Sequence, residues 1–234
     1  MVQEALLIPW QRRADFVRAL AVPLALLAGF YLAWYLLDEP ARQITGWTAV
    51  FLCWLAFAIL FALFAVTVHR LVLLDSRPLR GIPLPAWSMR EARFVLFILL
   101  IWAIYLAVWW VVLLIAGNLL PRGWFESSLQ PVEIAARLPA LYVIARLSLV
   151  FPATAIDRNA GLKWAWRASR GNGWRLVVVV TVLPWIVSHL FGLLYRDEPS
   201  TAEVVLLTVV GTALFALEIA ALSVAYRELA GNEP

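Results

Sequence analysis

Two charged residues, Arg146 and Glu218, lie deep inside long apolar stretches of the sequence. A charge at the centre of a membrane-spanning helix costs roughly 2.5–3.5 kcal/mol, so such residues are usually paired or functional. Neither has an opposite charge three or four positions away. At a rise of 1.5 Å per residue, both should lie about 12–15 Å above the inner ends of their helices. This equal depth predicts an interhelical ion pair, which would either fix helix packing or form a polar site on a substrate or proton path.

Glu133 and Arg137 form a second candidate pair, four residues apart in one apolar stretch. On a helix this spacing places the two side chains on one face, within ion-pair reach. We expect them near the outer interface of the membrane, where the long arginine side chain can extend toward water. The pattern predicts a structural pair.

Motifs for catalysis or metal binding are missing from the sequence. It contains no H-E-x-x-H, G-x-S-x-G, Walker or G-x-G-x-x-G motif in a suitable context. Cys53 is the only cysteine, and the two histidines, His69 and His189, fall near opposite ends of their expected helices. We therefore expect no catalytic residue, no metal site and no cofactor.

The composition requires a membrane environment. The chain has 234 residues, of which 64% are hydrophobic and 15% charged, and its mean hydropathy is +0.85. Soluble domains carry about 25% charged residues, and a helix needs about 20 mainly apolar residues to cross a bilayer. The sequence predicts an all-α fold: a polytopic integral membrane protein with one domain over 1–234, six transmembrane helices and short loops. The six expected helices cover 16–37, 46–73, 91–119, 131–156, 174–195 and 201–226.

The positions of basic residues indicate the orientation of the chain. Fourteen Arg and Lys residues fall at one side of the six expected helices, and only Arg42, Arg122 and Arg196 fall at the other. Cytoplasmic loops carry the excess of positive charge, so we expect both termini in the cytoplasm. The net charge of +4 is thus spread over short loops, and we predict no nucleic-acid partner.

Two segments on the expected inner side are amphipathic. Both mix tryptophan with cations, a composition typical of helices that lie on an anionic leaflet. Ordinary cytoplasmic loops carrying orientation signals would explain the same residues. In the first segment, the expected interface residues are Trp10, Arg12 and Arg13. The second segment covers 160–170, and the expected interface residues in it or just after it are Lys163, Trp164, Trp166, Arg167, Arg170, Trp174 and Arg175.

One stretch of about thirty residues resembles a known pattern. It runs from Arg-Leu-Ser-Leu-Val-Phe-Pro-Ala at 146–153, through Ala-Trp-Arg at 165–167, to Ser-Arg-Gly-Asn-Gly-Trp-Arg at 169–175. It is similar to bacterial six-helix proteins related to the membrane domain of some glycerophosphoryl diester phosphodiesterases. The resemblance implies a bacterial cytoplasmic membrane protein connected with the envelope or its lipids. It carries over no catalytic residue, because the soluble phosphodiesterase domain is not matched.

These observations favour a non-catalytic membrane protein. We expect an accessory or organising subunit of a membrane protein complex, or of envelope lipid organisation. Its expected partners are membrane lipids and other membrane subunits. The alternative is a small transporter or channel with a polar site around Arg146 and Glu218. An intramembrane lipid-modifying enzyme would need a nucleophile and a base, and the sequence offers no such set.

Overall fold

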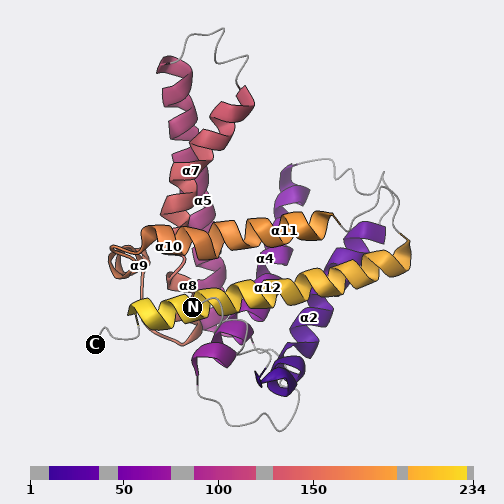
Figure 1. The fold of residues 1–234 in the computed structure, drawn as a ribbon. Helices are drawn as coiled ribbons and strands as arrows, with labels where there is room; N and C mark the ends of the chain where they lie inside the picture. The colour runs from indigo at the N-terminus through magenta and orange to yellow at the C-terminus, as the bar shows by residue number, and fades with distance from the viewer. Residues whose placement is uncertain (1–10, 37–46, 75–86, 120–128, 194–199, 231–234) are drawn as a thin grey trace.

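The computed structural model describes residues 11–36, 47–74, 87–119, 129–193 and 200–230. These residues form helices joined by turns and contain no strand. Figure 1 shows their order along the chain. The elements are α2 (Arg13–Leu36), α4 (Trp47–Leu73), α5 (Met89–Leu119), α7 (Leu129–Leu147), α8 (Val150–Ala155), α9 (Leu162–Ala168), α10 (Gly173–Val177), the π-helical turn η1 (Val178–Val182), α11 (Leu183–Gly192) and α12 (Thr201–Ala230).

Among the described residues, five helices are long and apolar enough to cross a membrane. The expected all-helical membrane character is confirmed to this extent. The first expected helix corresponds to α2, which is not among these five, so the count of six spans and the side of each terminus remain predictions. The five candidate spans are Val50–Leu73, Met89–Leu119, Val132–Ala155, Gly173–Leu190 and Ala202–Ala230.

Capping boxes begin two of the long helices, as their sequences predict. At the start of α5, the Ser88 backbone N–H donates to Glu91 Oε2 at 2.8 Å, and the Ser88 hydroxyl donates to the same oxygen. At the start of α12, Ser200 N–H donates to Glu203 Oε2 at 2.8 Å, and Glu203 N–H donates back to Ser200 Oγ at 3.3 Å. Each box satisfies backbone donors that the first helical turn leaves without partners.

Proline interrupts the fourth expected helix, 131–156. Pro152 has no N–H to donate to the carbonyl of Ser148, and its ring crowds that carbonyl. The Ser148 carbonyl instead accepts from Phe151 N–H at 3.0 Å, a tighter turn that separates α7 from α8. In the fifth expected helix, 174–195, Pro184 follows η1, so the chain widens into a π-helical turn where a normal hydrogen bond is lost.

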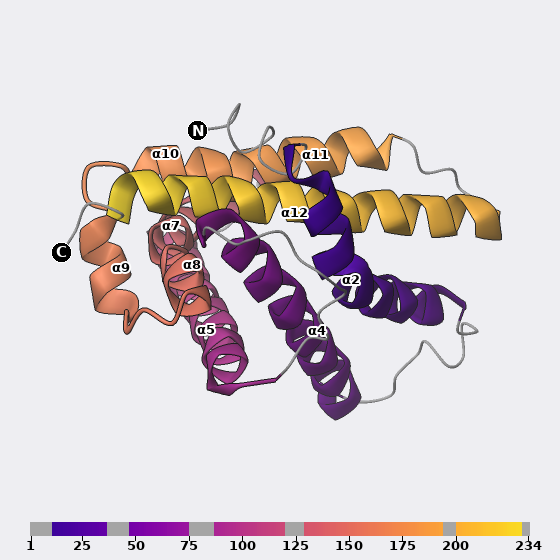
Figure 2. The same cartoon turned by 90° about the horizontal axis from the view of Figure 1, so that it is seen from below.

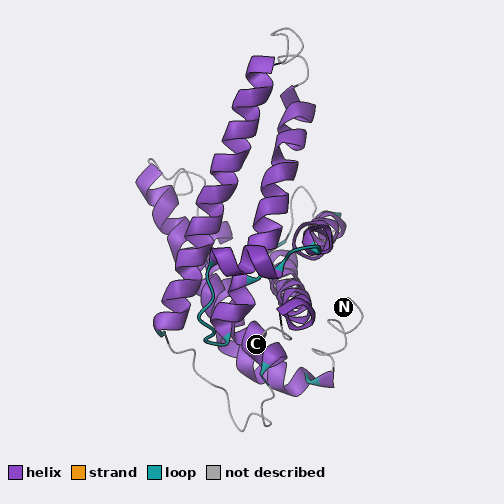
Figure 3. Cartoon of the chain, turned by 90° about the vertical axis from the view of Figure 1, so that its left-hand side faces the viewer, coloured by secondary structure: helices purple, strands orange, loops and turns teal. Residues whose placement is uncertain are grey.

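The helices do not share one axis. Figure 1 shows α5 and α7 side by side as a long hairpin, and α10–α11 beside α12 running across it. Figure 2 shows α12 crossing the ends of α4 and α8. In Figure 3 the α5–α7 hairpin stands upright, whereas other helices are seen nearly end-on. The described helices therefore form two crossing groups and not an up-and-down bundle.

Two hydrophobic clusters hold these groups together. The first lies among α2, α4, the start of α5 and α12, with Leu27, Phe64 and Val224 at its centre. The second lies among α7 to α10 and the end of α12. The rings of Phe94 and Phe151, 4.9 Å apart, join the two clusters. Small residues line many of these contacts, which lets helix backbones approach closely.

Large apolar side chains also cover much of the outer surface. Trp110, Leu114 and Leu193 are more than half exposed, as are many others on α4, α5, α7, α11 and α12. Water would not tolerate so many contiguous apolar side chains. This surface fits a protein whose solvent is largely lipid.

Candidate functional site

Arginine side chains make most of the polar contacts at one end of the molecule, and we call this region the arginine-rich end. It comprises the end of α4, the start of α5, α8, α9 and the end of α12. Four arginines each donate to a carbonyl in the last turn of another segment's helix. The bonds are Arg12 Nη1 to Leu71 O (2.8 Å), Arg70 Nη1 to Ala155 O (3.0 Å), Arg146 Nη2 to Trp166 O, and Arg158 Nη1 to Ala230 O (3.1 Å).

These arginines act as C-terminal caps. The last four carbonyls of a helix have no partner within it and carry the negative end of the helix dipole. A guanidinium group satisfies such a carbonyl and places a positive charge beside it. The sequence predicted Arg12, Arg70 and Arg158 as orientation signals and Arg146 as an ion-pair residue, and the capping role of all four was missed. The available signal was composition, because 18 of the 19 basic residues are arginine.

Asp157 ties three segments together at this end. It lies just after α8 with a positive φ of 62°, a conformation that few residues other than glycine tolerate and aspartate tolerates better than most. Its Oδ2 atom is 3.2 Å from Arg70 Nη1 at the end of α4 and 3.0 Å from Arg90 Nη1 at the start of α5. Asp157 was not a sequence candidate, because its partners come from distant parts of the chain.

The backbone carbonyls at the end of α8 all accept hydrogen bonds. Its last carbonyls at 152, 153 and 154 accept from the N–H groups of Ile156, Arg158 and Asp157. The remaining carbonyl, that of Ala155, accepts from Arg70. Every carbonyl in the last turn therefore has a donor, although the helix has only six residues.

Arg146 does not pair with Glu218, and the predicted ion pair is wrong. Arg146 Nε donates to Ser169 Oγ at 2.9 Å, and its guanidinium stacks on the Trp166 ring at 3.6 Å from the centroid. The Tyr142 ring lies on another side of it, at 5.8 Å. Helical rise gave the depth of each residue along its helix, but it did not give the direction in which each side chain points from the helix axis. The Arg146 side chain points to α9, which follows α8 in the chain and packs against α7.

Glu218 is half-buried on α12. No hydrogen bond or ion pair joins it to another described residue. Its helix packs mainly against α2 and α4 and also contacts η1, whereas α7, which carries Arg146, packs mainly against α5 and α10. The structure thus separates the two residues that the sequence predicted to form one polar site.

Glu133 and Arg137 also form no ion pair in the described structure. Arg137 instead lies over the ring of Trp109 on α5, 5.8 Å from its centroid. The helical spacing was correct, but a cation–π contact with the neighbouring helix competes with a weak pair along one helix. Arg137 is exposed and Glu133 half-buried.

The second amphipathic segment contains the predicted helix, over Leu162–Ala168. Ala165 and Ala168 face the protein and are buried, whereas Trp166 is 40% exposed. Trp174, on α10, is 70% exposed. The predicted cations on these elements and the turn between them are all exposed: Lys163, Arg167, Arg170 and Arg175. We call Lys163, Trp166, Arg167, Arg170, Trp174 and Arg175 the α9–α10 face.

The other predicted interface residues behave differently. Trp164 is half-buried, with its ring 6.0 Å from Tyr226 and the Arg158 guanidinium 4.9 Å away. Arg12 is engaged with Leu71 and, at 3.4 Å, with Asp15, whereas Arg13 is exposed. Trp10 lies outside the described residues.

A buried polar pair links α4 to α12. His69 Nδ1 lies 2.7 Å from Ser223 Oγ, and the Ser223 hydroxyl donates to Ile219 O at 2.9 Å. Because that hydroxyl has one hydrogen, Nδ1 carries the proton and donates to Ser223 in this network. Both residues are almost fully buried, so the pair has no access to a substrate and serves helix packing.

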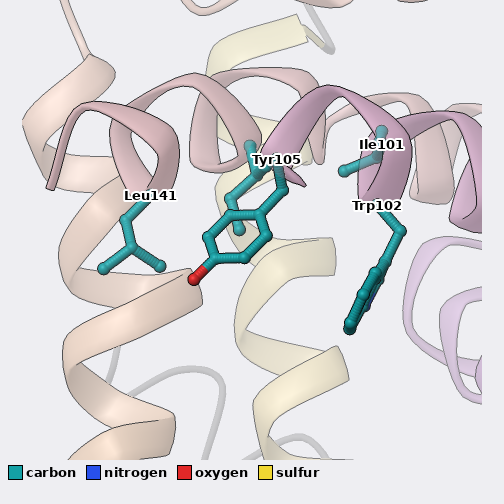
Figure 4. A pocket seen from close by; sticks show the side chains of 5 residues that line it. Ile101, Trp102, Tyr105 and Leu141 are labelled. Carbon is teal, nitrogen blue, oxygen red and sulfur yellow. The ribbon is translucent and has the colours of Figure 1, made fainter. Parts of the chain in front are cut away.

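A cavity of about 290 Å³ lies between α5 and α7. Its lining is Ile101, Trp102, Tyr105, Leu141 and Ile144. Figure 4 shows the Tyr105 ring between Leu141 and Trp102, with its hydroxyl directed toward the α7 side. These walls suit an apolar group such as an acyl chain, and the lining supplies no carboxylate, imidazole or thiol for catalysis.

Within the described ranges, no group of three or more His, Cys, Asp or Glu side chains could hold a metal ion. No family model, curated protein or solved structure matches the chain. The geometry of its own residues is therefore the basis for a functional proposal.

Proposed function

We propose that this chain is a non-catalytic, multi-pass protein of the bacterial cytoplasmic membrane that organises a membrane protein complex or its surrounding lipids. The observation that carries the proposal is the α9–α10 face. Two exposed tryptophans there lie among four exposed cations. Indole rings favour the headgroup level, and cations favour the anionic inner leaflet.

The position of this face supports a docking role. Arg146 holds α9 against α7 through Ser169 and Trp166, so the face is a fixed part of the fold. The neighbouring arginines are engaged in capping helices and in the Asp157 tie. The cations of the α9–α10 face remain exposed for lipid headgroups or an acidic partner.

The proposal is tested by purifying the protein in lipid nanodiscs and identifying co-purifying proteins and lipids by mass spectrometry. Replacing Trp166 and Trp174 with Ala should remove the partner or the enrichment of anionic lipid. The matched control replaces Trp110 and Trp185, whose exposure lies between those of Trp166 and Trp174 but which lie on α5 and α11. If both pairs of substitutions leave co-purification unchanged, the α9–α10 face is not the docking site.

The proposed orientation has a separate test. Alkaline phosphatase fused after Pro234 should be inactive, because the enzyme folds only outside the cytoplasm. A fusion within 122–130 should be active. The reverse pattern would contradict six spans with both termini inside.

A small transporter is the second candidate, and Glu218 is the observation that favours it. A half-buried carboxyl with no described partner in a candidate span is a common feature of ion and proton paths. Proteoliposomes should then show a proton flux that Glu218→Gln abolishes and that Glu203→Gln, at the start of the same helix, does not. Equal flux in all three would exclude this role for Glu218.

A further inference from the structure

A second cavity, of about 440 Å³, lies at the arginine-rich end between α5 and the segment that follows α8. We call it the α5–α8 cavity. Its polar wall includes Arg93, Arg158 and Asn159, and its apolar wall includes Leu96 and Phe97. It shares no residue with the α9–α10 face.

The charge of this cavity is positive. Arg70, Arg90, Arg93 and Arg158 lie in or beside it, against the two carboxylates of Glu91 and Asp157. Glu91 and Asp157 are already bound by Arg90, at 3.0 Å each, and Asp157 also by Arg70. The carboxylates therefore do not neutralise the cavity.

Arg93 is the arginine of the α5–α8 cavity that is available to bind a ligand. It is exposed, and no hydrogen bond or ion pair connects it to another described residue. Asn159, also exposed, lines the same cavity and offers an amide donor. A guanidinium group beside an amide donor suits phosphate oxygens, which arginine binds through two parallel hydrogen bonds.

The apolar wall continues directly from Arg93 along α5. Leu96 and Phe97 follow it by three and four residues, so the three side chains lie on one face of the helix. At 1.5 Å per residue, the backbone of Leu96 lies about 5 Å from that of Arg93 along the helix axis. Leu96 is half exposed, so apolar contact surface is available there. Free phosphate would leave this wall unused, whereas a lipid would occupy both parts.

We propose that the α5–α8 cavity binds one anionic phospholipid, with Arg93 and Asn159 at its phosphate and Leu96 and Phe97 along its glycerol and first acyl carbons. The inference rests on the proposed function, since it places the arginine-rich end at the inner leaflet. Basic pockets between helices on the cytoplasmic side are suited to such headgroups. This proposal specifies one class of lipid, and its binding residues are not those of the α9–α10 face.

Native mass spectrometry of the detergent-purified full chain tests this inference. The probes are phosphatidylglycerol, phosphatidylcholine with the same acyl chains, and water-soluble glycerol phosphate. Wild-type protein should bind one phosphatidylglycerol in preference to the other two. Arg93→Gln should weaken this binding about tenfold, the loss expected for a charge-assisted hydrogen bond, and Arg93→Lys should restore part of it.

Arg137→Gln is the matched control, because Arg137 is exposed on α7 and belongs neither to the cavity lining nor to the α9–α10 face. It should leave the tight phosphatidylglycerol site unchanged. Equal weakening by Arg93→Gln and Arg137→Gln would overturn the site, since binding would then follow net charge. Equal binding of phosphatidylcholine, or of glycerol phosphate, would overturn the choice of ligand. These results do not depend on Trp166 or Trp174, so failure of this site and failure of the proposed function are distinguishable.

Discussion

Replacing Arg146 with Met tests whether this residue belongs to α9 or to Glu218. The substitution keeps the length of the side chain and removes its charge. It deletes the 2.9 Å bond to Ser169 Oγ, the bond to the Trp166 carbonyl and the stacking on the Trp166 ring. A hydrogen bond to a charged group contributes about 1.5–3 kcal/mol, and an exposed cation–π contact about 0.5–1 kcal/mol. Because Arg146 is half-buried, we take the lower end for each of the two hydrogen bonds and for the stacking contact, and expect a loss of about 3.5 kcal/mol.

A double-mutant cycle then identifies the partner. Arg146→Met combined with Ser169→Ala should show a coupling free energy of about 1 kcal/mol, as residues in one network do. Arg146→Met combined with Glu218→Leu should be additive within about 0.5 kcal/mol. The measurement is reversible unfolding in mixed micelles with increasing SDS, followed by circular dichroism. Strong coupling to Glu218 with none to Ser169 would refute the described packing of α7 and α9.

Three other substitutions test local features by the same unfolding measurement. Ser88→Ala removes the capping box at the start of α5 and should cost about 1 kcal/mol. Gly173→Ala places a Cβ 2.6 Å from the Tyr142 hydroxyl oxygen, so we expect a loss of about 1–3 kcal/mol that Tyr142→Ala partly relieves. Ser223→Ala leaves the buried His69 Nδ1–H without its acceptor and should cost about 1–3 kcal/mol.

Each of these has an outcome that would contradict it. Unchanged stability in Ser88→Ala would mean that water replaces the cap. A full loss in Gly173→Ala that Tyr142→Ala does not relieve would place the strain elsewhere. A stable Ser223→Ala protein would show that His69 finds another acceptor, and Ser188→Ala, at an exposed position, is its control.

Features that depend on neighbours in sequence were predictable. The capping boxes at Ser88 and Ser200 follow from a serine and a glutamate three residues apart, and both are present. The helix within 160–170 follows from its pattern of Trp, Leu and cations. Such features require only local geometry, which the sequence determines directly.

Features that depend on direction in space were not predictable. Helical rise gave Arg146 and Glu218 a similar depth, but depth does not say which way a side chain points around its helix. The chain turns after α8, and α9 then lies against α7 beside Arg146. Asp157 gains its importance from Arg70 and Arg90, which are 87 and 67 residues away along the chain. A single sequence contains no signal for these contacts.

The C-terminal caps have a consequence for the order in which the protein is made. In all four cases the arginine precedes the helix end that it caps: Arg12 before Leu71, Arg70 before Ala155, Arg146 before Trp166 and Arg158 before Ala230. Chains fold from the N-terminus while they are synthesised. Each of these helix ends therefore leaves the ribosome after its cap has already been made, and none of them has to wait for a later donor.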